Sequence, residues 1–183
     1  MIVTISGRPG SGKSAVAIRL AERLGLDHVS AGDFMREMAQ ERGVSILELS
    51  RSAEAQDVID REIDERTVRF GTQRDGFVMD ARLGWHFIPD SVGVFLDVRP
   101  DEAARRIYGA GRTTERENTD LGATRNAIED RTRSEALRYQ SYYGIDYLDH
   151  ANYDLVVDTS DLGIDEVVDR IVAHLTASDH HQP

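Results

Sequence analysis

The sequence predicts an open α/β fold, with a parallel sheet covered by helices on both faces. Short apolar runs alternate along the chain with longer segments of helical periodicity. Several of the runs, such as 77–79 and 155–157, are apolar at successive positions, as expected for strands buried on both sides. A length of 183 residues suits one domain with a substantial core.

The expected elements follow in order along the chain. Strands are predicted at 2–6, 27–30, 76–79, 92–98 and 153–157. A helix is predicted over 14–24, where Val16, Ala17, Leu20 and Leu24 form one apolar stripe. Another follows Pro100, a long polar helix spans 121–143, and the last helix carries its apolar stripe from Ile164 to Leu175.

Two segments break the alternation. Residues 33–70 contain no strand pattern and predict two or three short helices, and residues 108–120 are polar and glycine-containing. In an enzyme these would be a helical cap and a flexible lid; otherwise they are a helical excursion and a surface loop. We therefore expect one domain with its core in 1–32, 71–107 and 144–177, the cap in 33–70, the lid in 108–120 and a frayed tail at 178–183.

The charge balance narrows the classes of partner. The chain has 33 acidic and 22 basic residues, a net charge of -11, which disfavours general binding to nucleic acid or anionic membranes. No apolar window is long enough to span a bilayer. The absence of cysteine excludes disulfides, a thiolate nucleophile and cysteine-bound zinc. We expect a cytoplasmic monomer whose partners are small molecules.

A phosphate-binding motif follows the first strand. Residues 7–14 match G-x-x-x-x-G-K-[ST] at every defined position and lead into an amphipathic helix. Glycines let the backbone wrap an anion, and the following helix adds its positive N-terminal end. Of the 22 basic residues 21 are arginine, and the single lysine, Lys13, falls where the motif requires it. We expect ATP bound with Mg²⁺, Ser14 as a metal ligand, and nucleotide contacts from Gly7, Arg8, Pro9, Gly10, Ser11, Gly12, Lys13, Ser14 and Ala15.

A P-loop site also needs a carboxylate at the end of another strand. Asp80 follows the apolar run 77–79 and is predicted to hold Mg²⁺ through water. Asp97, after the run 94–96, is the alternative, although Val98 extends that strand. Arg82 lies two residues beyond Asp80 and could face the same crevice, which favours Asp80.

Arginines gather in the lid and in the helix after it. Arginine suits transferring phosphates because its fork of donors matches their oxygens. Most of these side chains are expected to pair with neighbouring glutamates, but Arg112, Arg116 and Arg131 are predicted to neutralise the charge in transit. Arg131 and Arg138 are seven residues apart and therefore share a helix face.

A second anion site is predicted at the end of the second strand. Ser30 and Gly32 form a turn at the carboxyl end of that strand, where open α/β sheets bind ligands. Asp33 can cap the next helix, and Arg36 lies one turn further along. A plain strand–turn–helix connection would give the same pattern.

Together these stretches resemble the nucleoside monophosphate kinase family, and most closely its short cytidylate kinases. The resemblance covers nearly the whole chain and is carried by 5–14, 30–33, 59–64, 134–136, 142–146 and 153–159. It implies a five-stranded parallel sheet, a helical cap for the monophosphate, a closing lid, and transfer of the ATP γ-phosphate to CMP or dCMP with Mg²⁺. It also implies ATP-base contacts near Asp158 and Thr159, and acceptor contacts from Ser30, Gly32, Asp33, Arg36, Asp60, Asp80, Arg82, Gly84 and Trp85.

The sequence departs from the family in the segment 80–86, where E-x-R-x-x-G is commoner, and at Arg8, where a smaller residue is commoner. A same-fold kinase of AMP, another nucleotide or a shikimate- or gluconate-like metabolite is therefore the alternative. A nucleotide switch or hydrolase is a third possibility, but it would have no need for the second anion site at Arg36 and Arg82.

Overall fold

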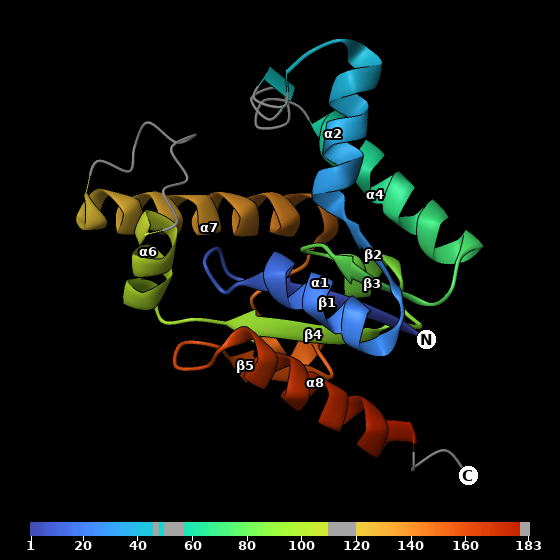
Figure 1. Ribbon diagram of the computed structural model, residues 1–183. Coiled ribbons are helices and arrows are strands. Elements are labelled where there is room, and N and C mark those ends of the chain that lie inside the picture. The colour runs from blue at the N-terminus through green and yellow to red at the C-terminus, as the bar shows by residue number, and fades with distance from the viewer. Residues whose placement is uncertain (46–47, 50–56, 110–119, 180–183) are drawn as a thin grey trace.

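Five parallel strands form the centre of the protein. The computed structural model describes residues 1–45, 48–49, 57–109 and 120–179 (Figure 1). The strands lie in the order β2-β3-β1-β4-β5. Their bounds are β1 Ile2–Gly7, β2 Asp27–Ser30, β3 Phe77–Asp80, β4 Val92–Asp97 and β5 Leu155–Asp158.

Helices connect the strands and project above one end of the sheet. Their bounds are α1 Lys13–Leu24, α2 Ala31–Arg42, α4 Asp57–Gln73, α5 Gly84–Phe87, α6 Pro100–Gly109, α7 Leu121–Tyr143 and α8 Ile164–Asp179, with a 3₁₀ turn η1 at His150–Asn152. Helices α2 and α4 rise together away from the sheet, and α7 runs across the fold toward α6 (Figure 1). None of the helices in the described ranges is long and apolar enough to cross a membrane.

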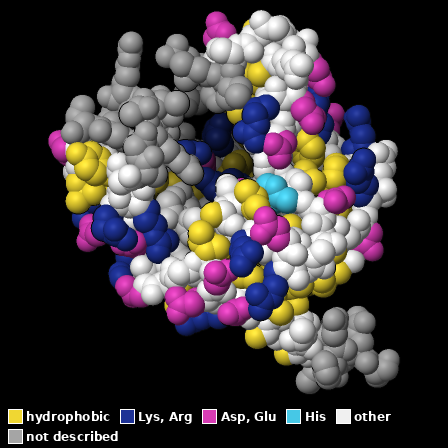
Figure 2. Space-filling model, in the orientation of Figure 1, with side chains coloured by type: hydrophobic (Ala, Val, Ile, Leu, Met, Phe, Trp, Pro, Cys, Tyr) yellow, Lys and Arg dark blue, Asp and Glu magenta, His cyan; other side chains and the backbone are white. Residues whose placement is uncertain are grey.

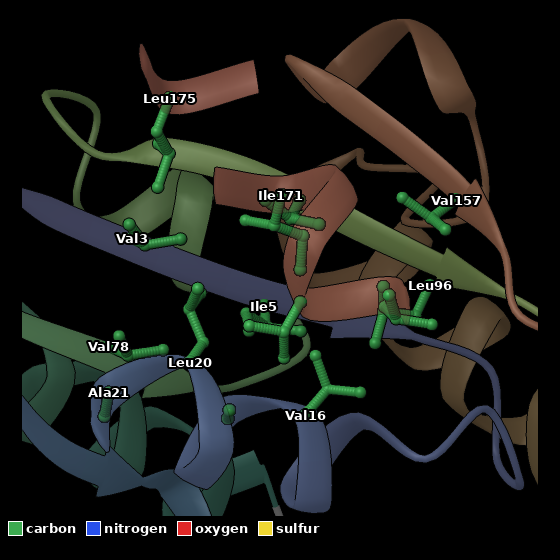
Figure 3. Close-up of a cluster of buried hydrophobic side chains, with 14 residues drawn as sticks. Val3, Ile5, Val16, Leu20, Ala21, Val78, Leu96, Val157, Ile171 and Leu175 are labelled. Atoms are coloured by element: carbon green, nitrogen blue, oxygen red, sulfur yellow. The ribbon is translucent and has the colours of Figure 1, made fainter. Parts of the chain in front are cut away.

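The main core lies between the sheet and the pair α1 and α8. Val16 and Leu20 of α1 and Ile171 of α8 pack against Ile5 and Leu96 of the central strands (Figure 3). These side chains are at most 1 % exposed, because the apolar stripes of both helices meet the same sheet face. A second cluster on the opposite face joins strand β3 to α2 and the end of α4 through Phe34, Phe70 and Phe77.

The expectation of a five-stranded parallel sheet covered on both faces is therefore confirmed. The long polar helix spans 121–143 as predicted. Several boundaries differ by one or two residues. In particular, β4 ends at Asp97, so Val98 does not extend the strand, and β5 begins at Leu155 rather than at residue 153. Within the predicted cap, the described residues of 33–70 are helical or connecting and contain no strand.

Strand register brings the candidate site together. Asp80 at the end of β3 lies opposite Ile5 of β1 and opposite Ser30 of β2. Gly7, where the phosphate-binding motif begins, lies opposite Leu96 of β4. The carboxyl ends of β2, β3 and β1 therefore meet beneath the cap, where open α/β sheets bind ligands.

Candidate active site

The loop 7–14 forms a turn between β1 and α1 that is suited to hold an anion. Gly10 and Gly12 adopt left-handed backbone angles, with φ of 82° and 84°. A Cβ at Gly12 would meet no atom within 4 Å, whereas one at Gly10 would lie 2.8 Å from Ala103 of α6. One side of the loop is thus packed against the protein and the other is open at the start of a helix, which fits a bound phosphate.

Lys13 and Ser14 both contact Asp80. The Lys13 ammonium forms an ion pair with the Asp80 carboxylate, and the Ser14 hydroxyl donates to its other oxygen at 2.5 Å. The side chain of Asp80 is 4 % exposed. Burial and the nearby Arg82 guanidinium hold the pKa of Lys13 well below its usual value.

The hydroxyl and carboxylate at this point fit magnesium. Mg²⁺ prefers oxygen ligands and is held in phosphotransfer sites by one or two protein groups with water and phosphate. Within the part of the chain that the structure describes, no group of three or more acidic, histidine or cysteine residues forms an all-protein cage. Asp97, the alternative carboxylate, instead accepts from Arg8 at 2.9 Å and lies 3.5 Å from His150.

Arg82 lies beside the loop, with its side chain 15 % exposed. Its Nε donates to Glu135 at 2.8 Å, and its Nη1 donates to the carbonyl of Gly7 at 2.9 Å. Glu135 also accepts from Arg131 Nε at 3.1 Å, so two of the predicted phosphate-binding arginines share one carboxylate. The ion pair with Glu135 raises the pKa of Arg82 despite its burial.

The segment after β2 is a capped helix start: α2 begins at Ala31 with Ser30 as its N-cap, so Asp33 is the third helical residue and not the cap that was expected. The Ser30 hydroxyl accepts from the Asp33 amide, and the Asp33 carboxylate accepts from the Ser30 amide, forming a reciprocal capping box. Arg36 pairs with Asp33, is 58 % exposed, and lies beside Gly32, where a Cβ would be 3.7 Å from its Nη1. The structure thus places an exposed cation above the end of β2.

Asp60 joins the cap to α7. Its carboxylate lies 3.1 Å from Arg138 Nη1, and the two side chains are 14 % and 23 % exposed. Arg138 follows Glu135 by one helical turn, so it lies on the same part of α7 as the arginine cluster. Figure 2 shows the surface hollowed between the cap and the side on which α6 and α7 lie, with Lys or Arg side chains inside the hollow.

Gly84 and Trp85 make packing contacts. A Cβ at Gly84 would be 3.1 Å from Thr4, and the Trp85 ring packs edge-on against Tyr153 at 5.5 Å. Their contact with an acceptor stays a prediction. Arg112 and Arg116 lie outside the described residues, so their role also stays a prediction.

The predicted ATP-base segment lies next to the loop 7–14. The Thr159 hydroxyl donates to the Ser11 carbonyl at 3.1 Å, and Asp158 accepts from the Ser160 amide at 2.9 Å. Arg106 of α6, which sequence reasoning did not single out, donates to the Thr159 carbonyl at 2.7 Å. These contacts fix the β5–α8 connection against the loop and α6.

A model of the cytidylate kinase-like family matches residues 2–161. The chain belongs to the cytidylate kinase-like family. It is 42 % identical to a cytidylate kinase of Haloquadratum walsbyi, over 97 % of this chain and 90 % of that protein. It is 42 % identical to a cytidylate kinase of Methanothermobacter thermautotrophicus, over 87 % of this chain and 96 % of that protein.

Solved structures outside the family share the fold. A shikimate kinase of Bacteroides thetaiotaomicron superposes with a TM-score of 0.67 over 96 % of this chain and 98 % of that one, at 14 % sequence identity. At that identity the likeness concerns the arrangement of the sheet and helices. The match to the cytidylate kinase-like family, by contrast, covers residues 2–161, which include the segments that carry the candidate site residues.

The sequence did not single out two residues of this site, Glu135 and Arg138, as functional. Glu135 lay in a segment quoted only for family resemblance, and Arg138 was noted only for sharing a face with Arg131. The signal available was a carboxylate four residues after Arg131 on the same helix face, but paired charges at that spacing are also common on solvated helices.

Proposed function

We propose that the protein is a nucleoside monophosphate kinase that transfers the γ-phosphoryl group of ATP to CMP or dCMP with Mg²⁺. One observation carries the proposal: Arg82 and Arg131, two of the arginines predicted to bind phosphate, share Glu135 and lie near enough to the P-loop lysine to lower its pKa. A P-loop switch or hydrolase needs one phosphate site, whereas a kinase with a phosphorylated acceptor needs two. Membership of the cytidylate kinase-like family supports the same activity.

The residues divide the work between donor and acceptor. The loop 7–14 would hold the ATP phosphates, with Lys13 on the outer ones, because its open side lies at the N-terminus of α1. Ser14 and Asp80 would hold Mg²⁺, which supplies charge neutralisation to the phosphates. Phosphate charge arriving at Lys13 favours its protonated form and opposes the effect of burial on its pKa.

Arg36 and Arg82 would grip the acceptor phosphate from two sides. Arg82 is fixed at the end of β3, and Arg36 stands on α2 of the cap. Attack by one phosphate on another needs alignment and charge neutralisation more than proton removal, which explains why no general base is required. Arg131 reaches Glu135 from α7 and would contact the group in transit.

The pair Asp60 and Arg138 supports cytosine as the acceptor base. A carboxylate accepts hydrogen bonds and a guanidinium donates them, and the two lie side by side. Cytosine offers an amino donor next to a ring-nitrogen acceptor, which matches this pair. Uracil reverses both positions, so it would leave these partly buried polar groups mismatched, and such mismatches give strong discrimination.

The test is a coupled kinase assay with ATP and Mg²⁺ against CMP, dCMP, UMP, AMP, GMP and shikimate. We expect turnover with CMP or dCMP and at least about 100-fold lower kcat/KM for the others, from loss of a matched hydrogen-bonding pair. Asp60→Asn should narrow the preference for CMP over UMP. Glu65→Gln, at an exposed position of the same helix, should not. Turnover with shikimate, or ATP hydrolysis with no acceptor phosphorylated, would contradict the proposal.

A further inference from the structure

Glu135 is the carboxylate that Arg82 and Arg131 share. It lies on α7, the polar helix, yet its side chain is only 9 % exposed. Its carboxylate accepts from Arg82 at 2.8 and 3.5 Å and from Arg131 at 3.1 Å. The hydroxyl of the fully buried Tyr147 lies 3.3 Å from the same group.

These contacts keep Glu135 charged in a place where carboxylates are disfavoured. Burial alone would raise its pKa, but the Arg82 and Arg131 guanidinium groups hold it at about 2. A buried carboxylate persists only when paired and hydrogen-bonded. The charge on Glu135 and the positions of the two arginines therefore depend on each other.

Arg82 is fixed from two directions. Glu135 holds its Nε and Nη2, and the carbonyl of Gly7 holds its Nη1. A guanidinium has a single N–H on Nε and a pair on each terminal nitrogen, so these bonds leave one N–H on each terminal nitrogen. Those remaining donors are the pair that can bind two oxygens of one phosphate.

We propose that Glu135 is a positioning residue that orients Arg82, and with it Arg131, for the acceptor phosphate. This inference rests on the proposed function, in which Arg82 binds that phosphate. Glu135 acts through the arginines. It also balances part of the positive charge of Lys13, Arg82 and Arg131, whose mutual repulsion would otherwise spread them apart.

A purely structural role for Glu135 would give a different kinetic result. A buried ion pair that only joins α7 to the end of β3 would lower the amount of folded enzyme, or the affinities for both substrates, rather than catalysis with the acceptor alone. A positioning role is lost when Arg82 is absent, because the group that it orients is gone. The distinguishing measurement is therefore a double-mutant cycle in kcat/KM for the acceptor.

The cycle compares Glu135→Gln in the wild-type protein and in an Arg82→Met background, with CMP as acceptor. We expect Glu135→Gln alone to lower kcat/KM for CMP by about 10- to 100-fold, the usual effect of removing a supporting group, with the KM for ATP changed by less than about 3-fold. In the Arg82→Met background, Glu135→Gln should lower kcat/KM for CMP by no more than about 3-fold, and this remaining effect would come from Arg131. Equal losses in the two backgrounds, or an equal rise in the KM for ATP, would overturn the inference.

Two further variants control for a general effect of removing a charge from α7 and for misfolding. Glu129→Gln removes a carboxylate from the same helix at an exposed position, 3.1 Å from Arg125, and should leave the kinetics unchanged. If Glu135→Gln does not fold, Glu135→Asp keeps the charge but withdraws it by one methylene. It should then lower kcat/KM for CMP selectively and lose that effect in the Arg82→Met background; an effect independent of Arg82 would overturn the inference. If the wild-type protein phosphorylates no monophosphate, the proposed function itself fails, whereas an active enzyme with an additive cycle refutes only the role of Glu135.

Discussion

Alanine at Gly10 and alanine at Gly12 should have different effects, because Gly10 lies on the packed side of the phosphate-binding loop and Gly12 on its open side. The two glycines have nearly the same left-handed backbone, with φ of 82° and 84°. An added methyl at Gly10 would lie 2.8 Å from both the Cα and Cβ of Ala103 on α6, whereas at Gly12 it would meet nothing within 4 Å. The pair therefore isolates the steric contribution.

The magnitudes follow from two costs. A left-handed backbone costs an alanine about 1–2 kcal/mol, and a smaller gain from stiffening the unfolded chain offsets part of it, about 0.4–1 kcal/mol. Gly12→Ala should then lower the free energy of unfolding by about 1 kcal/mol. Overpacking against a backbone adds about 1–3 kcal/mol, so Gly10→Ala should lower it by about 2–4 kcal/mol.

Urea denaturation and ATP binding together test this reasoning. Gly10→Ala should be the less stable variant, while Gly12→Ala should be the one that loses ATP affinity beyond what its stability explains, because its methyl projects into the space where phosphate would lie. Each variant controls for the backbone strain of the other. Equal changes in the free energy of unfolding, or undiminished ATP affinity in Gly12→Ala, would refute the proposed geometry.

Three further predictions concern charged residues. Lys13→Ala should lower turnover by at least about 100-fold, as expected when one transition-state donor is removed, while leaving the protein folded, because burial already disfavours its ammonium. Arg36→Ala should raise the KM for the acceptor by about 10- to 100-fold through loss of a charged hydrogen bond, and the KM for ATP by far less. Burial and Asp60 raise the pKa of Asp64 to about 6 from 3.8, although the Tyr143 hydroxyl donates to its carboxylate. A raised carboxyl pKa stabilises the fold fully below pH 3.8 and loses that contribution as the pH rises to about 6. The unfolding free energy of Asp64→Asn should therefore fall less across this window than that of the wild type, by about 1–3 kcal/mol.

Each of the three has its own contradicting outcome. Turnover of Lys13→Ala close to that of the wild type would refute the assignment of residues 7–14 as the ATP-phosphate-binding loop. Circular dichroism checks that any loss of turnover does not come from unfolding. Equal KM increases for both substrates in Arg36→Ala would contradict separate donor and acceptor sites. Parallel pH profiles for Asp64→Asn and the wild type, measured by urea denaturation from pH 4 to 7, would show that Asp64 does not titrate in this range.

Local patterns in the sequence were sufficient to predict the fold and to single out the phosphate-binding loop and Asp80 as candidate site residues. Strands β1, β3 and β4 follow from their apolar runs, since burial on both faces of a sheet imposes continuous apolar sequence. The choice of Asp80 over Asp97 also came from the sequence, because Arg82 follows Asp80 by two residues. The expected extension of β4 through Val98 is wrong. The structure supports the choice through the contacts of Asp80 with Lys13 and Ser14.

The sequence by itself determined the α/β class, the phosphate-binding loop and its lysine, because each of these depends on a short segment with a fixed spacing. Only the tertiary structure showed that Glu135 holds Arg82, 53 residues away, and that Arg138 pairs with Asp60 on the cap. Helix α7 carries polar and apolar residues all around its surface, so its periodicity gives no sign of which glutamate is buried. That choice depends on which face of α7 meets the end of the sheet, a matter of long-range packing.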